Sequence, residues 1–277
     1  MRILSIQSSV AHGHVGNSAA VFPLQRIGHE VLPVFTVHFS NHTGYGAWRG
    51  PVLAAEDVHQ VILGIEERGA LAGVDLVLSG YLGHPDIVAV VLDAVERVKK
   101  ANPAASYACD PVMGNPLSGC FVDPAIPPLI RDRLVAHADV VTPNQFELGL
   151  LTGVDGVLEG ARAARALGPS TVLVTSVEDP AKPEETGMVA VTGDGAWSVR
   201  TPRLPRKTGG SGDVTAALFS AHLLSTGDPG EALARTASSV FDLLSATHEA
   251  DSPELLLVES QEYYAHPRRQ FAVRQLP

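Results

Sequence analysis

The chain has 277 residues, 45% hydrophobic and 18% charged, as is typical of a globular protein with a substantial core. With a formal net charge of −10 and no lysine- and arginine-rich block, we expect no nucleic-acid partner. We also expect no membrane partner, because no apolar run approaches the ~20 residues of a membrane span. The polar start does not resemble a signal peptide, and two cysteines without metal spacing fit reduced thiols; together these features predict a cytoplasmic protein.

Short β-rich runs alternate with longer helical patterns along most of the chain. The expected strands are 3–6, 31–37, 76–78, 106–109, 140–141 and 171–174, and the expected helices between them are 17–27, 55–68, 86–100 and 161–167. Strands that alternate with helices predict an α/β fold with a parallel sheet covered on both faces.

The last third of the chain departs from this alternation. Residues 187–192 and 196–200 flank a Gly-Asp-Gly turn, which predicts an antiparallel hairpin. Two helical runs, 214–224 and 231–245, follow. Without an internal repeat or a linker, the pattern predicts a single domain over residues 1–277.

Polar, glycine-containing segments follow the predicted strands. They are 7–17, 79–85, 110–119, 142–147, 175–176 and the turn 209–213. Because ligands bind beyond the carboxyl ends of the strands in open parallel sheets, we expect these segments to form one cleft.

Glycines precede Asp213 at the point where an apolar helical run begins. Free amides and the helix dipole make such a start an anion site, here formed by Gly210, Ser211 and Gly212. A carboxylate beside it is suited to deprotonate a hydroxyl that attacks a phosphate. The alternative is that Asp213 only caps the helix and the glycines only make a turn.

Asp110, Asn144 and Glu147 also follow expected strands, and their oxygen atoms are ligands of the kind that Mg²⁺ prefers. The alternatives are a strand-ending turn at Asp110 and a capping box formed by Asn144 and Glu147. Two such motifs upstream of an anion site favour binding of a magnesium–nucleotide complex.

The segment 39–45 carries several small hydrogen-bonding side chains, which could address a heteroaromatic ring or simply form a polar surface loop. His12 and His14 lack a third metal ligand at suitable spacing and are interpreted as ordinary loop residues. The sequence has neither a P-loop nor a GxGxxG motif after a strand, so ATP would be bound by the late glycines.

These motifs resemble those of the pyridoxal kinases, which are ribokinase-like small-molecule kinases. Gly-Ser-Gly-Asp at 210–213 matches the Gly-x-Gly-Asp signature of the ribokinase-like group. Segments 6–8, 16–17, 22–25, 39–45, 78–83, 109–114 and 142–147 are similar to the pyridoxal branch. The resemblance covers nearly the whole chain. It implies a three-layer α/β/α sandwich with a mostly parallel central sheet, small β elements at the edge, and a homodimer.

The resemblance also implies a role for each matching residue. Asp213 would be the general base that faces the 5′-hydroxymethyl group of pyridoxal, while the amides of 210–212 hold the transferring phosphoryl group. Ser8 and Thr43 would contact the ring substituents, and Tyr81 would border the ring. Asp110, Asn144 and Glu147 would organise Mg²⁺ and the ATP phosphates, with Asp110 and Glu147 as metal ligands and Thr175 and Ser176 near the terminal phosphate.

Some positions depart from the family pattern or leave a choice open. Asn115 stands where some relatives have a second Asp and is not assigned to the metal. Arg206 and Lys207 precede the glycines and either assist phosphate binding or are solvated. Cys120 lies in an expected flap, where it either forms a reversible hemithioacetal with the bound aldehyde or is inert. The sequence leaves open a requirement for K⁺ and the preferred vitamer.

The resulting hypothesis is ATP-dependent phosphorylation of the 5′-hydroxymethyl group of pyridoxal to pyridoxal 5′-phosphate and ADP. One alternative is a related kinase for hydroxymethylpyrimidine, a sugar or another small hydroxymethyl compound, and segment 40–45 favours pyridoxal over these. A second alternative is a vitamer-binding protein without catalysis, which would have no need of a base at Asp213.

Overall fold

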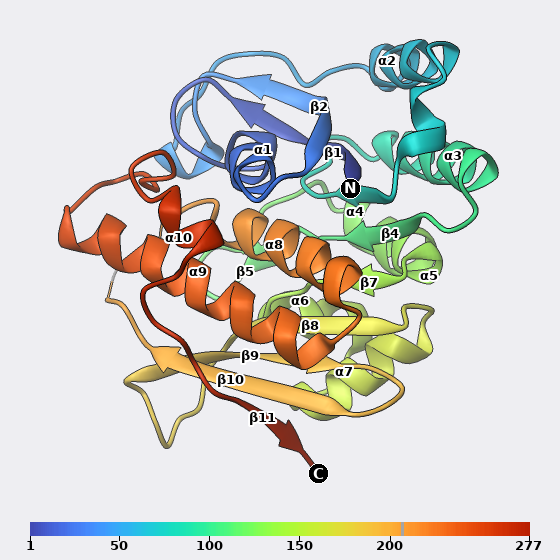
Figure 1. Cartoon of the computed structure of the whole chain (residues 1–277). Helices are drawn as coiled ribbons and strands as arrows, with labels where there is room; N and C mark the ends of the chain where they lie inside the picture. Colours follow the sequence, from blue (N-terminus) through green and yellow to red (C-terminus); the bar gives the residue numbers. More distant parts are fainter. Residues whose placement is uncertain (206–207) are drawn as a thin grey trace.

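The computed structural model describes residues 1–205 and 208–277. Its centre is a nine-stranded sheet with the order β11-β10-β9-β8-β7-β4-β3-β1-β2 (Figure 1). The strands are β1 (Arg2–Val10), β2 (Glu30–Phe39), β3 (Leu76–Ser79), β4 (Ser106–Cys109), β7 (Val140–Val141), β8 (Thr171–Val177), β9 (Glu185–Val191), β10 (Ala196–Pro202) and β11 (Val273–Leu276). Neighbours from β2 to β8 are parallel, whereas β9, β10 and β11 pair antiparallel at one edge.

Helices cover both faces of this sheet (Figure 1). One face carries α1 (Asn17–Arg26), α8 (Ser211–Thr226), α9 (Pro229–Glu249) and the short α10 (Glu262–Ala265). The other carries α2 (Ala55–Glu67), α3 (Ile87–Ala101), α4 (Ile126–Leu129), α5 (Val135–His137), α6 (Gln145–Thr152) and α7 (Val157–Ala166). Shorter turns are η1 (Thr43–Tyr45), η2 (Ala70–Gly73) and η3 (Ile130–Leu134). The predicted α/β class, with three layers and a mostly parallel sheet, is confirmed.

The central strands are apolar on both faces because helices cover both. Along β1, Ile3 packs in the core under α1, α8 and α9, whereas the next residue, Leu4, packs in the core under α2 and α3. On β3, Leu76 and Val77 are divided between the two cores in the same way. Successive side chains of a strand point to opposite faces of the sheet, so each central strand contributes to the apolar core on both faces.

Helix α8 occupies the middle of its layer, packed against α1 on one side and α9 on the other. All residues from 214 to 222 are buried, which explains why its sequence is apolar on every face. A left-handed Gly227 ends the helix, and Asp228 then caps α9 by accepting hydrogen bonds from the amides of Gly230 and Glu231 at 2.8 and 3.0 Å. This burial fixes the position of the glycine-rich turn at its N-terminus.

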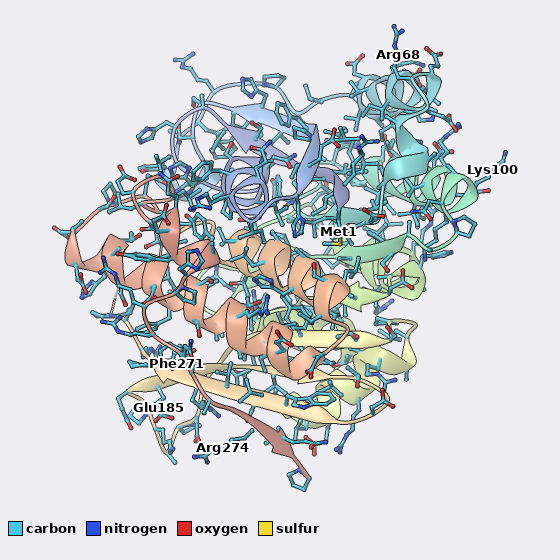
Figure 2. The ribbon with its side chains drawn as sticks, in the orientation of Figure 1. Met1, Arg68, Lys100, Glu185, Phe271 and Arg274 are labelled. Carbon is cyan, nitrogen blue, oxygen red and sulfur yellow. The ribbon has the colours of Figure 1, made fainter. Side chains whose placement is uncertain are left out.

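The structure adds elements that the sequence pattern did not predict. β11 pairs with β10, and a small separate sheet joins β5 (Gly114–Asn115) to β6 (Gly119–Cys120). Charged side chains at helix ends, such as Arg68 and Lys100, extend away from the sheet (Figure 2). None of the helices in the described ranges is both long and apolar enough to cross a membrane.

Candidate active site

Asp213 lies in the first turn of α8, two residues after the helix begins. The helix begins after Gly210, which has a left-handed φ of 84° and supplies no side-chain cap, so the interpretation of Asp213 as the N-cap is wrong. The Asp213 carboxylate instead accepts hydrogen bonds from the backbone N–H of Gly16 and from its own N–H. Burial raises its pKa to about 6, although the residue keeps partial exposure.

Segments from the two ends of the chain meet at this turn. A Cβ added to Gly210 would lie 1.8 Å from the carbonyl oxygen of His14, and one added to Gly16 would lie 2.2 Å from Ser8 Oγ. A Cβ at Gly209 would lie 3.3 Å from His42 Nε2. Backbone packed this closely leaves no room for side chains at 210 or 16. The glycine-rich turn is thus in contact with both the turn that follows β1 and the loop that follows β2.

A small apolar cluster lies at the carboxyl ends of β1 and β2. Val10, Val37 and Phe39 are buried together at the ends of β1 and β2, and Tyr81 packs against them. The carbonyl oxygen of Tyr81 accepts a hydrogen bond from Thr36 Oγ1 at 2.7 Å, which ties it to β2. Such a cluster is suited to hold one face of a flat ring.

Thr43 opens η1, a short turn directly after His42. This turn therefore begins beside the residue whose ring approaches Gly209. Ser8 lies within β1 and is buried, Thr43 opens the turn after β2, and Tyr81 lies two residues after β3. All three are therefore near the carboxyl ends of neighbouring strands. Their roles toward a ligand stay predictions.

Three carboxylates share the region between α8 and α6. Asp110 is buried at the end of β4, where its Oδ1 accepts a hydrogen bond from Thr142 Oγ1 at 3.0 Å. Burial, together with the charges of Glu147 and Asp213, raises the pKa of Asp110 well above its usual value. Burial also raises the pKa of Glu147 to about 7, and the charge of Asp213 adds to the rise. The three groups therefore concentrate negative charge where little water can screen it.

Asn144 and Glu147 form a complete capping box at the start of α6. Asn144 Oδ1 accepts from the amides of Phe146 and Glu147 at 2.9 and 3.0 Å, and Glu147 Oε2 accepts from the amide of Asn144 at 2.9 Å. Glu147 Oε1 also accepts from the amides of Met113 and Gly114 at 2.9 and 3.3 Å. The predicted capping box therefore forms. The same two residues also bind the backbone of Met113 and Gly114, where the 114–120 hairpin begins.

The remaining predicted residues lie along the same sheet edge or beside it. Thr175 bridges to Asn144 at the end of β8, and Ser176 after it has a left-handed φ of 54°, a strained conformation for a serine. Cys120 is an exposed free thiol on β6. Arg206 and Lys207 lie outside the described residues.

One residue that contacts the loops around the glycine-rich turn, Glu254, was not predicted from the sequence. It is buried in the segment after α9, and its carboxylate contacts the loops at 12–14 and 42–45. Because its partners lie 240 and 209 residues away in the chain, no local pattern could have indicated the contact.

Comparisons with known proteins identify relatives over the whole length of the chain. A curated relative from Leifsonia xyli subsp. xyli, Pyridoxal kinase PdxY, is 66% identical over 279 residues and covers 99% of each chain. A second, from Corynebacterium diphtheriae, is 60% identical over the full length of both. The chain belongs to the pyridoxal kinase family. The family model described as phosphomethylpyrimidine kinase also matches residues 66–252.

Solved structures show the same fold. Pyridoxal kinase from Leishmania donovani in complex with ADP and pyridoxamine superposes with a TM-score of 0.93 at 30% identity, and covers 100% of this chain and 99% of that chain. Its complex with ADP alone gives a TM-score of 0.94 at the same identity and coverage. These relatives confirm the predicted ribokinase-like fold and the predicted assignment to the pyridoxal kinases.

Proposed function

We propose that this protein transfers the γ-phosphoryl group of ATP to the 5′-hydroxymethyl group of pyridoxal, which yields pyridoxal 5′-phosphate and ADP. Membership of the pyridoxal kinase family and the ADP and pyridoxamine complexes of a structural relative support this reaction. The observation that carries it is the position of Asp213, a partly accessible carboxylate beside the glycine-rich helix start and the N-terminal loops.

In the proposed reaction, Asp213 accepts the proton of the hydroxyl group as its oxygen bonds to the γ-phosphorus. The bond from that phosphorus to the bridging oxygen breaks, and ADP leaves with the electron pair. A pKa of about 6 leaves Asp213 ionised at neutral pH, yet more basic than an ordinary aspartate. The amides of 210–212 would stabilise the charge on the transferring group without reorganising.

The donor set fits a magnesium ion among the nucleotide phosphates. No three His, Cys, Asp or Glu side chains within 1–205 and 208–277 form a ready metal cage, which suits an ion held partly by phosphates and water. Asp110 is the better direct ligand, since both Glu147 oxygens already accept backbone amides. When bound, Mg²⁺ would neutralise phosphate charge, and it would relieve the repulsion that raises the pKa of Asp110.

Initial rates on pyridoxal, pyridoxine and hydroxymethylpyrimidine would test the substrate. We expect kcat/KM to be highest for pyridoxal, by about tenfold or more over hydroxymethylpyrimidine, because the loops around Ser8 and Thr43 match the pyridoxal branch. A coupled ADP-release assay gives the rates. A preference for hydroxymethylpyrimidine would support the alternative kinase, and tight pyridoxal binding without ADP release would support a storage protein.

We also propose that the protein is a cytoplasmic homodimer. Exposed apolar side chains gather along the outer strand β2 and the segment paired with it, where Phe35, Trp48 and Val52 are 37%, 46% and 46% exposed. A second copy could cover these side chains. Sedimentation equilibrium should give twice the chain mass of 29.1 kDa, and Trp48→Ser should shift it toward the monomer. A monomeric wild-type protein would contradict the proposal. The cytoplasmic location is inferred from the sequence, in which the two cysteines have no spacing typical of a disulfide framework.

A further inference from the structure

Glu254 joins two loops that the chain places far apart from it. Its Oε2 accepts a hydrogen bond from the backbone N–H of His14 at 3.1 Å. Its Oε1 accepts a hydrogen bond from the Tyr45 hydroxyl at 2.5 Å and lies 3.4 Å from His42 Nε2. Both oxygens of this carboxylate therefore accept hydrogen bonds from the protein, and the side chain is only 11% exposed to water.

The two loops held by Glu254 are the ones that border the glycine-rich turn. The carbonyl oxygen of His14 lies against Gly210, and the His42 ring lies against Gly209. Thr43, the residue predicted to contact the vitamer, stands between the two Glu254 partners on its loop. The glycine-rich turn and the two loops thus form one packed unit, and Glu254 supports it from the side of α9.

Tyr45 shows how much its loop depends on this carboxylate. The residue is 47% exposed, and its ring contacts are to His42 and His12, with ring centroids 4.7 and 6.1 Å away. The hydrogen bond to Glu254 raises the pKa of Tyr45, so the hydroxyl stays protonated and remains a donor. Asn41 closes the loop internally, because its Nδ2 donates to the carbonyl oxygens of His42 and Ala47 at 3.2 and 2.8 Å. The contacts of Tyr45 and His42 with Glu254 are what tie the loop to the segment after α9.

We propose that Glu254 is a positioning residue that holds the 42–45 loop and the 12–16 turn against the glycine-rich turn, so that the hydroxymethyl group of the bound vitamer faces Asp213. Glu254 itself touches neither substrate nor nucleotide. The inference rests on the proposed function, since it deepens the account of the same cleft. The residues predicted to bind the nucleotide are elsewhere: Asp110 follows β4 and is hydrogen-bonded to Thr142, and Asn144 caps α6 and donates to the carbonyl oxygen of Gly114.

Kinetics of Glu254→Ala would test this role. We expect KM for pyridoxal to rise about tenfold or more, because the 12–16 turn and the 42–45 loop lose their anchor. KM for ATP should stay within about twofold of the wild-type value, because the buried helix α8 still fixes the glycine-rich turn. Glu254→Gln should recover most of the loss: its amide oxygen can accept from His14 N, while its amide nitrogen donates to the Tyr45 oxygen. Tyr45→Phe, which removes one hydrogen bond at an exposed site, should raise the same KM about threefold.

Glu259→Ala is the matched control, because Glu259 is an exposed carboxylate of the same segment. It should leave both KM values unchanged. Pyridoxal affinity measured by calorimetry separates this inference from the proposed function. If the wild-type protein binds pyridoxal but does not phosphorylate it, only the proposed function is refuted. Unchanged pyridoxal KM and affinity in Glu254→Ala, or equal loss for both substrates, would overturn the positioning role. Should Glu254→Ala fail to fold, Tyr45→Phe and Glu254→Gln decide in its place.

Discussion

Asp213→Asn should lower kcat for pyridoxal by ~10²–10⁴ while the protein still folds and binds both substrates. Asparagine keeps the shape and can still accept the hydrogen bond from the Gly16 amide, but it cannot take the hydroxyl proton. Coupled ADP release measures kcat, and calorimetry measures the affinity for pyridoxal and ATP. An activity within about threefold of wild type would remove Asp213 from the mechanism.

The same substitution should change the pH dependence in a defined direction. In the wild-type protein log kcat/KM should rise with pH as Asp213 ionises near pH 6 and Glu147 near pH 7, and level off above that range. In Asp213→Asn the part of the pH profile that Asp213 sets should disappear. The part set by Asp110 and Glu147 should move to lower pH, because the charge of Asp213 helps to raise the pKa values of these two residues. A limb that stays at the same pH would contradict the shared electrostatics of the three carboxylates.

Stability should move in the opposite direction to activity. Folding raises the pKa of Asp213, so the folded state binds more protons than the unfolded state between about pH 4 and 6, and this residue destabilises the fold at higher pH. Asp213→Asn should therefore unfold at a higher temperature than wild type at pH 8, by an amount that corresponds to about 3 kcal/mol at most. Asp57→Asn is the matched control, since Asp57 occupies the same position in α2 but is exposed; it should lower stability slightly.

Most of the fold could be predicted from the sequence, because strands that are buried on both faces are short, continuous apolar runs. The other strands of the parallel core and the 187–200 hairpin were predicted close to their observed bounds, but β1 and β8 continue to Val10 and Val177, through residues that were predicted to follow the strands. β11 was missed because Val273–Leu276 is part-exposed and short, and only the free edge of β10 makes it a strand. Its conformation depends on a partner about 77 residues earlier, which a local pattern does not contain.

The site was predictable where one short segment contains the chemistry. The glycines before Asp213 indicated an anion site, and Asn144 with Glu147 matched both a metal-binding pattern and a capping box; the structure shows that the capping box forms beside Asp110. What the residues do with a ligand stays predicted. Glu254 could not be found in this way, because a buried carboxylate acquires its role only from the loops packed around it.

Gly210→Ala should be the most damaging change in the glycine-rich turn. The added methyl group would lie 1.8 Å from the backbone oxygen of His14, and the left-handed φ of 84° adds a cost of about 1–2 kcal/mol for any L-residue. The turn and the 12–16 segment must then move apart, and a displacement of about 1 Å at the reacting groups costs about 10²-fold in rate. We expect kcat/KM to fall by at least that factor, as measured by coupled ADP release, with a lower Tm in thermal unfolding.

Gly227→Ala separates the two causes, because Gly227 lies at the other end of the same helix. It has a similar left-handed φ of 68°, but a Cβ there would meet nothing within 4 Å. This variant should lose about 1 kcal/mol of stability and keep its activity, since strain alone does not reach the cleft. If Gly210→Ala lost no more activity than Gly227→Ala, the close approach of His14 to the turn would have no part in aligning the transferring phosphoryl group. A much larger loss at 210 would show that this contact, which joins the two ends of the chain, sets the geometry around Asp213.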